Sequence, residues 1–206
     1  QGVVNRYQII TDENTILKIE KLEPFQYPER VSYAFSKNDM LCLVGINGNL
    51  SVVNRKNGNI QFIRNIRQEM DKYGIISDIV SDDTDYLISF KTAGVIKLYP
   101  NGLGQYEVER INLDCGIFSM YRDEAQDIVW FATDGQGAII YSKDNYSLKT
   151  ETFTMLHDKI SKPVRAIFGD RENSLWIGTK GDGILKYNNY NKSTTNINSA
   201  DLHTIK

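Results

Sequence analysis

The chain has few of the residues that disulfide frameworks and metal centres require. Its 206 residues include two cysteines, two histidines and four prolines. Cys42 and Cys115 are too few for a disulfide framework, and no Cys or His spacing suggests a zinc site. Both are therefore expected to be free thiols packed as small apolar side chains. His157 and His203 stand alone in polar segments, so no catalytic or metal-binding role is expected of them.

The sequence also lacks a strong charge of either sign and any long apolar run. It carries 24 basic and 26 acidic residues, which gives a formal net charge of −2. This balance provides no electrostatic basis for binding nucleic acid or an anionic membrane surface. No apolar run approaches the roughly 20 residues of a membrane-spanning helix, and residues 1–10 do not resemble a signal peptide. We therefore expect no membrane contact by this chain, and any signal or anchor of a longer parent to lie outside it.

Five related segments recur along the chain. The clearest pair is LWIGTKGDGILKY, at Leu175–Tyr187, and VWFATDGQGAIIY, at Val129–Tyr141. The spacing between successive copies is about 45 residues, with one shorter first step, and such a period of strand-like units is typical of propellers and other repeat arrays. The repeat cores lie near residues 8–19, 42–53, 87–98, 130–141 and 176–187.

Each repeat consists of short strand-like runs separated by turn residues. In the last copy, three apolar runs are separated by GDREN and KGDG, and a more polar run at 189–197 follows. Four strands per repeat predict an all-β fold, namely a β-propeller of four-stranded antiparallel blades. A helical turn or two is expected only at Ile66–Tyr73. A β-sandwich with similar strands is the alternative fold.

Two tryptophans occupy the same position in their repeats. Trp130 and Trp176 each supply a large apolar side chain, and both are expected to pack between neighbouring blades. Cys42 holds that position in its own repeat and should also be buried. Truncation of Trp176 to alanine is therefore expected to create a cavity and to cost about 3–5 kcal/mol of stability.

The two ends of the chain are compatible with two arrangements. The first core contains its second and third strands, and the tail Ser199–Lys206 resembles the approach to a first strand. If this tail folded beside Gln8–Thr11, about five blades would close within a single domain spanning residues 1–206. Alternatively, the chain is a partial propeller whose open blades need a second chain to cover them.

The stretch VRAIFGDRENSLWIGTKGDGILKYN, which begins at Val164, closely resembles the two-component regulator propeller repeat. Asn173 and Ser174 replace the usual turn glycine and its neighbour. The copy at Ile117–Tyr141 is recognisable, with one extra residue before Trp130, and the three earlier copies are weak. The matching positions are Val164, Ile167, Asp170, Leu175, Trp176, Ile177, Gly178, Thr179, Gly183, Leu185 and Tyr187.

The resemblance implies a role in signalling. Repeats of this family build the extracytoplasmic sensors of large membrane-bound regulators, many of them Bacteroides-type hybrid histidine kinases that respond to glycan fragments. It therefore implies a periplasmic, non-enzymatic sensing module of a membrane-anchored parent, with no cofactor and no metal. The implied partners are an oligosaccharide and either a second copy of the chain or the rest of a larger propeller. Such sensors usually contain two seven-bladed propellers, which favours the partial propeller for this chain.

Candidate ligand contacts lie in two sets of loops. The loops between second and third strands and the loops that enter each first strand are expected to open on one face, around the channel mouth. Their mixed polar side chains suit hydroxyl-rich or anionic sugars. The candidate residues are Lys91, Asp134, Gln136, Arg165, Lys180 and Asp182.

Two other function classes are compatible with the fold. A five-bladed glycoside hydrolase needs two carboxylates that flank one sugar linkage, and Asp78 and Asp114 are the candidates near the starts of first strands. A scaffold that binds protein through its blade edges would instead present a large apolar patch. No catalytic constellation is recognisable in the sequence, so we do not expect the chain to be an enzyme.

Overall fold

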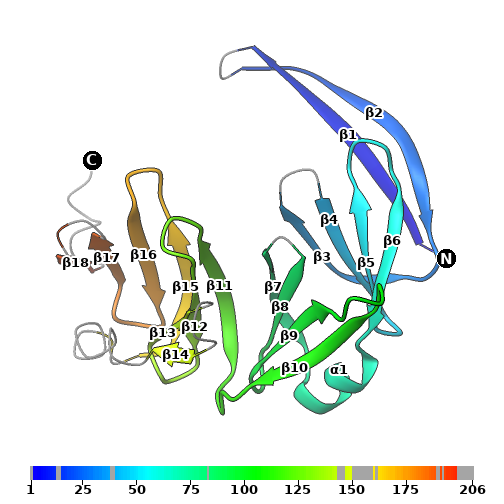
Figure 1. Ribbon diagram of the computed structural model, residues 1–206. Coiled ribbons are helices and arrows are strands. Elements are labelled where there is room, and N and C mark those ends of the chain that lie inside the picture. The colour runs from blue at the N-terminus through cyan, green and yellow to red at the C-terminus, as the bar shows by residue number, and fades with distance from the viewer. Residues whose placement is uncertain are drawn as a thin grey trace. The chain divides into compact units, whose positions relative to one another are not determined.

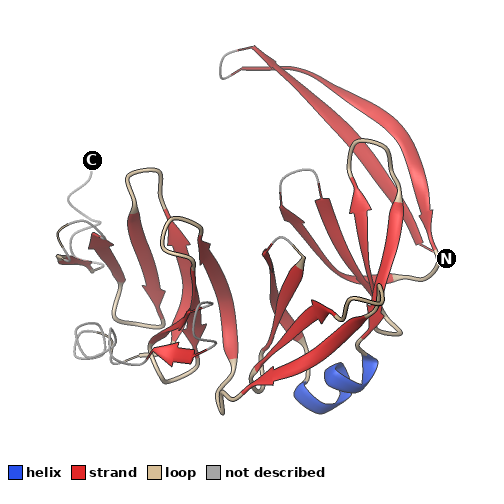
Figure 2. Cartoon of the chain, viewed as in Figure 1, coloured by secondary structure: helices blue, strands red, loops and turns tan. Residues whose placement is uncertain are grey.

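A computed structural model describes residues 2–12, 15–37, 40–82, 84–142, 147–149, 160, 162–188, 191 and 193–198 of the chain. This part is nearly all β, with one short helix, α1 (Arg67–Tyr73), where a helical turn or two was expected (Figure 2). The strands are β1 (Gly2–Asp12), β2 (Thr15–Tyr27), β3 (Val31–Lys37), β4 (Met40–Gly45), β5 (Asn49–Asn54), β6 (Ile60–Asn65), β7 (Ile76–Asp82), β8 (Asp85–Phe90), β9 (Val95–Pro100), β10 (Tyr106–Ile111), β11 (Ile117–Asp123), β12 (Ile128–Thr133), β13 (Ala138–Ser142), β14 (Ser147–Lys149), β15 (Val164–Gly169), β16 (Ser174–Thr179), β17 (Ile184–Asn188) and β18 (Thr194–Ile197).

Sixteen of these strands form four sheets of one design. Each sheet contains four antiparallel strands in the order of the chain: β3–β6, β7–β10, β11–β14 and β15–β18 (Figure 1). The predicted all-β fold of four-stranded antiparallel blades is confirmed. In each sheet the second and third strands hold one repeat core, so the repeat in the sequence corresponds to the repeat in the structure.

The first repeat core differs from the prediction. It lies in β1 and β2, which pair only with each other and are 11 and 13 residues long. Because β2 leads directly into β3, the first strand of the next sheet, this hairpin holds the third and fourth places of its repeat. The prediction that it supplies the second and third strands was therefore wrong. The tail that was predicted to complete it lies outside the described residues.

The chain divides into two compact units, Gln1–Gln68 and Glu69–Lys206. The first unit contains the β1–β2 hairpin and the β3–β6 sheet. One cluster of its buried side chains consists of Tyr27, Leu43 and Val53, and partly buried Phe25 packs against them. The Tyr27 side chain is 1% exposed, and its hydroxyl donates to the Asn49 carbonyl at 3.0 Å. The base of the hairpin is therefore anchored on the sheet that follows it.

The second unit contains three sheets whose first strands lie in succession, β7 beside β11 and β11 beside β15. The middle sheet is buried on both faces. Val129, Trp130, Phe131 and Ala132 follow one another in β12, and all four are buried. Since successive side chains of a strand point to opposite faces, a run of this kind requires a neighbouring sheet on each side.

Side chains of the first strands also link neighbouring sheets. Each first strand has a register shift near its start, and a shift of this kind re-aims a side chain. At this point the Asp78 carboxylate of β7 accepts the backbone N–H of Met120 in β11 at 2.8 Å. One sheet further on, the Ser119 hydroxyl accepts the N–H of Ile167 in β15 at 3.1 Å. Two pairs of neighbouring first strands are thus joined by a side-chain hydrogen bond at equivalent positions.

The two tryptophans have different environments. Trp130 is 2% exposed, and its ring centroid lies 6.4 Å from that of Tyr187 in the next sheet. Trp176 is only partly buried, because no further sheet among the described residues of the second unit covers its face. Its indole N–H donates to Asp170 at 2.6 Å, and the Lys186 ammonium lies 4.9 Å from its ring centroid. The expectation that Trp176 is buried between blades is wrong for this chain.

Truncation of the two tryptophans should therefore have unequal effects. We expect Trp130→Ala to lower the free energy of unfolding by about 3–5 kcal/mol, because it leaves a cavity between two sheets. Trp176→Ala should cost clearly less, since solvent already reaches the ring. Urea unfolding followed by circular dichroism measures both, and equal losses would contradict the assigned burial.

The Asp170 carboxylate should make stability depend on pH in the acid range. The Trp176 indole, then the Ser174 amide, donates to it, and these bonds lower the pKa of Asp170. A carboxyl group with a lowered folded-state pKa stabilises the fold above its unfolded pKa of about 3.9, and that contribution is lost as the pH falls through the folded-state pKa. Urea midpoints of the wild type should therefore fall more steeply below pH 4 than those of Asp170→Asn. Parallel curves for the two proteins would overturn this assignment.

Candidate functional site

The two predicted loop sets meet at one end of each four-stranded sheet. In every sheet the residue that follows the second strand donates its backbone N–H to a carbonyl just before the first strand. The same bond therefore recurs in all four sheets and gives each one a short, clamped loop end. The bonds join Ile46 to Arg30, Lys91 to Ile75, Asp134 to Gly116 and Lys180 to Pro163, each at 2.9 Å.

A threonine fixes the loop between the second and third strands in the last two sheets. The Thr133 hydroxyl donates to the Gly137 carbonyl at 2.6 Å and accepts the N–H of Gln136 at 3.0 Å. Thr179 makes the same two bonds in its own loop, at 2.8 and 2.9 Å. Gly135 and Gly137 have φ values of 95° and 71°, which side chains with a Cβ rarely adopt. The repeat motif therefore encodes a rigid turn.

The predicted ligand residues lie on these loop ends. Lys91, Asp134, Gln136 and Lys180 are exposed in the loops, and Asp182 is partly exposed. Each of them stands at the loop end of its own sheet, as predicted. Whether they bind a ligand together stays a prediction, because the pockets described below are lined by other residues.

Arg165, the sixth predicted residue, belongs to the first strand β15. Its guanidinium carbon lies 3.8 Å from the ring centroid of Phe118 in the neighbouring first strand β11. The planar cation therefore stacks on an aromatic ring, which holds it in place while it remains exposed to solvent. A guanidinium held in this way is suited to bind a carboxylate or a hydroxyl group.

The two carboxylates proposed for a hydrolase are used for other interactions. Asp78 accepts the N–H groups of Ile79 and Met120, both at 2.8 Å. Burial raises the pKa of Asp78, and the same two hydrogen bonds act in the opposite direction. The Asp114 side chain is 96% exposed and lies 3.7 Å from Arg110. In the part of the chain that the structure describes, no group of three or more His, Cys, Asp or Glu side chains is arranged to hold a metal ion.

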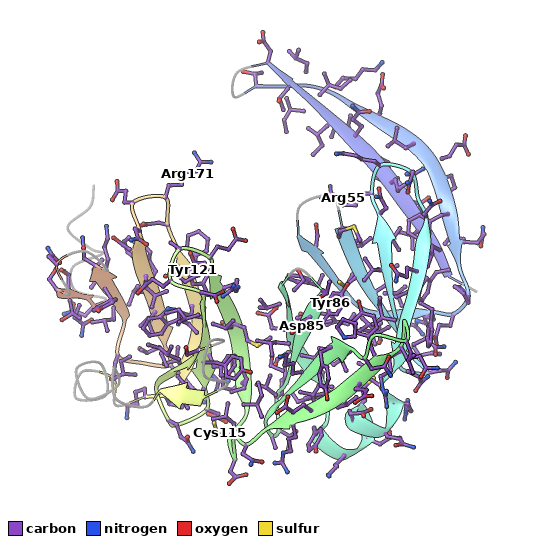
Figure 3. All side chains as sticks on the ribbon, viewed as in Figure 1. Arg55, Asp85, Tyr86, Cys115, Tyr121 and Arg171 are labelled. Atoms are coloured by element: carbon purple, nitrogen blue, oxygen red, sulfur yellow. The ribbon has the colours of Figure 1, made fainter. Side chains whose placement is uncertain are left out.

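The two cysteines are buried free thiols, as predicted. Burial raises the pKa of Cys42 to about 11 and also raises the pKa of Cys115. Figure 3 labels Cys115 just before β11, at the loop end of that sheet, with Tyr121 toward the opposite end of the strand. Since the thiolate is the nucleophilic form of cysteine, neither thiol is suited to catalysis.

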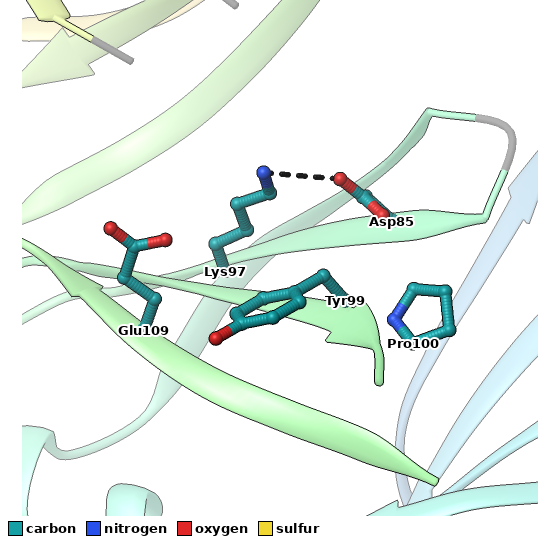
Figure 4. A pocket seen from close by; sticks show the side chains of 5 residues that line it. All are labelled: Asp85, Lys97, Tyr99, Pro100 and Glu109. Atoms are coloured by element: carbon teal, nitrogen blue, oxygen red, sulfur yellow. Dashed lines mark ion pairs between the residues drawn. The ribbon is translucent and has the colours of Figure 1, made fainter. Parts of the chain in front are cut away.

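A polar hollow that the sequence analysis missed lies on the β7–β10 sheet. It has a volume of about 430 Å³ and is lined by Asp85, Lys97, Tyr99, Pro100 and Glu109 (Figure 4). The Lys97 side chain is 8% exposed, and its ammonium lies 3.1 Å from the Asp85 carboxylate. One feature of the sequence could have indicated this hollow. Lys97 stands at the position of the repeat that buried Ile140 holds in the β11–β14 sheet.

The first unit has a larger groove between its hairpin and its sheet. The groove measures about 670 Å³, and its lining includes the cationic residues Arg6, Arg55 and Lys56. Arg6 donates to the Glu23 carbonyl at 2.9 Å, and Arg55, labelled in Figure 3, donates to the Ser36 hydroxyl at 3.3 Å. Each guanidinium group is therefore held in place by a hydrogen bond.

Comparison with known proteins supports the family resemblance. The family model described as two component regulator propeller matches residues 158–181. No curated protein matches the sequence. No helix in the described ranges is long and apolar enough to cross a membrane.

Solved structures with the same fold include extracellular domains of two component systems from Bacteroides. One is named as the extracellular domain of the hybrid two component system BT4673 from B. thetaiotaomicron; it is 19% identical with a TM-score of 0.58, over 94% of this chain and 26% of that one. The corresponding domain of BT3049 is 13% identical with a TM-score of 0.52, over 86% and 26% of the two chains. YCF48 from Cyanidioschyzon merolae is 12% identical with a TM-score of 0.55, over 90% and 64%. This chain thus spans about a quarter of the length of the Bacteroides domains.

Proposed function

We propose that this chain is part of the periplasmic sensor of a hybrid two-component regulator and acts by binding. The observation that carries the proposal is the repeat itself. The family model matches its last copy, and the four-stranded blades have the fold of extracellular domains from Bacteroides two-component systems. The histidine kinase and the membrane anchor belong to the parent protein in this proposal.

The proposed ligand is a glycan fragment that contacts the loop ends of the sheets. Arg165, held on Phe118, is the best-positioned of the six candidate residues. The loops that carry Gln136 and Asp182 have backbones fixed by threonine hydrogen bonds, so little backbone entropy is lost when a ligand binds there. Mixed donors, acceptors and both charges suit the hydroxyl and carboxylate groups of sugars.

The chain is further proposed to be one part of a larger propeller. In the last sheet Phe168 is 62% exposed and Ile184 is 36% exposed. Their counterparts in the preceding sheet, Tyr121 and Ala138, lie on the face that the last sheet covers. An apolar sheet face of this kind favours another blade as its cover, either from the rest of the propeller or from a second copy. Binding would then signal by moving the propeller relative to a downstream domain.

A protein-binding scaffold is the second candidate function, and the β1–β2 hairpin favours it. Six large apolar side chains of the hairpin are more than half exposed, and an isolated two-stranded hairpin is marginal in water. A partner protein that adds to the hairpin would cover them. These side chains are Val3, Tyr7, Ile9, Ile16, Leu17 and Ile19.

The glycan proposal is tested by binding of oligosaccharides to the wild type and to two matched variants. An oligosaccharide array identifies the ligand, and calorimetry then measures its affinity. We expect Arg165→Ala to weaken binding at least tenfold, because it removes the stacked cation from the loop end. The control is Arg171→Ala, in the exposed turn between β15 and β16 at the opposite end of the same sheet, labelled in Figure 3. Equal affinities of the two variants would overturn the assignment of the loop ends.

A further inference from the structure

The polar hollow of the β7–β10 sheet is lined by a lysine of the cross-strand row that contains tryptophan in two other sheets. One cross-strand row contains Trp130 and Ile140 in the third sheet, and Trp176 and Lys186 in the last sheet. In the β7–β10 sheet the corresponding pair is Leu87 and Lys97. Leucine offers no aromatic face, and the Lys97 ammonium lies instead 5.6 Å from the ring centroid of Tyr99. Both Lys97 and Tyr99 line the hollow.

The lysine of the hollow is directed away from its cross-strand neighbour. Lys97 stands opposite Glu109 in the register of β9 and β10, yet its ammonium pairs with Asp85 on the other side, in β8. Figure 4 shows this arrangement, with Glu109 and Asp85 on either side of the lysine chain. The Glu109 carboxylate makes no hydrogen bond or ion pair with any residue that the structure describes, and it is exposed. It is therefore available to a ligand.

The charges around the hollow favour a cationic ligand. Asp85 and Lys97 compensate each other, which leaves the charge of Glu109 unbalanced. Glu107 adds a second negative charge next to it, and the Tyr99 hydroxyl donates to that carboxylate at 3.3 Å. An anion would be repelled by both glutamates, whereas an ammonium group would be attracted by both.

The other groups of the hollow suit a compact polar ring. Tyr99 and Pro100 offer apolar surface beside the carboxylate (Figure 4). The Asp85–Lys97 pair presents an acceptor and a donor 3.1 Å apart, which is the separation of ordinary hydrogen-bonding atoms. A pair of neighbouring hydroxyl groups on one ligand can bind both. The volume of about 430 Å³ lies in the range of small-molecule sites.

We propose that this hollow binds a compact, hydroxyl-bearing ammonium ligand of the amino-sugar class. Its ammonium group pairs with Glu109, its ring packs on Tyr99 and Pro100, and its hydroxyl groups contact the Asp85–Lys97 pair. The site is separate from the loop ends and does not depend on the sensor proposal. The β7–β10 sheet would then carry a ligand site of its own beside Lys97.

The test uses NMR titration of the whole chain with glucosamine, glucose and N-acetylglucosamine. We expect glucosamine to shift the amide signals of Asp85 and of residues 97–109, with at least tenfold weaker responses to the two uncharged sugars. Glu109→Gln should lose at least tenfold in glucosamine affinity, because it removes the ion pair. Glu172→Gln, which changes an 80% exposed carboxylate in a turn of the last sheet, is the matched control and should bind like the wild type.

Three outcomes would overturn the proposal. Glucose that binds as well as glucosamine would show that the ammonium group is not recognised. Unchanged affinity of Glu109→Gln, with its spectrum still that of the folded chain, would remove the ion pair from the site. Signal changes confined to other parts of the chain, or no changes at all, would show that the hollow is not a site. None of these results bears on Arg165 and the loop ends, so failure here is distinct from failure of the proposed sensor function.

Discussion

Burial of both faces of a four-stranded sheet is the constraint on which the structure depends. A strand such as β12, with four consecutive buried residues from Val129 to Ala132, is stable only between two other layers. Inside the second unit, neighbouring sheets cover these faces. The Asp78 and Ser119 side chains accept backbone N–H groups of the next first strand and so join the sheets. Where the described part of that unit has no further sheet, Phe168 is exposed and Trp176 is only partly buried. Asp170 and Lys186 contact the indole there instead.

This constraint also decides where ligands can bind. Sheet faces are used for packing, so the ends of the sheets and any gaps between side chains are what remain for recognition. The ends carry short loops fixed by a repeated backbone bond and by Thr133 and Thr179. A gap lies on the β7–β10 sheet, where buried Lys97 pairs with Asp85. The same repeat thus yields two kinds of polar surface, one at the loop ends and one on the side of a sheet.

Much of the fold could be predicted because the repeat is local. The spacing of apolar runs, the paired glycines and the W-I-G-T motif predicted four strands per blade, and the loop ends followed from their order. The role of the hairpin could not be predicted, because a degenerate core does not say which two strands of a blade it supplies. The burial of Trp176 was predicted wrongly for a similar reason, since burial depends on a neighbouring sheet and not on the residue. The hollow at Lys97 could not be predicted, because the sequence does not show that this lysine pairs with Asp85. Tertiary packing decides that pairing.

Neighbouring first strands are held together by side chains that accept backbone N–H groups. Native-state hydrogen exchange can test this, because Asp78 and Ser119 accept the amide protons of Met120 and Ile167. We expect both amides to exchange only when the second unit unfolds as a whole, at the rate set by its global stability. Exchange of either amide as fast as that of the β1–β2 hairpin would contradict the claim.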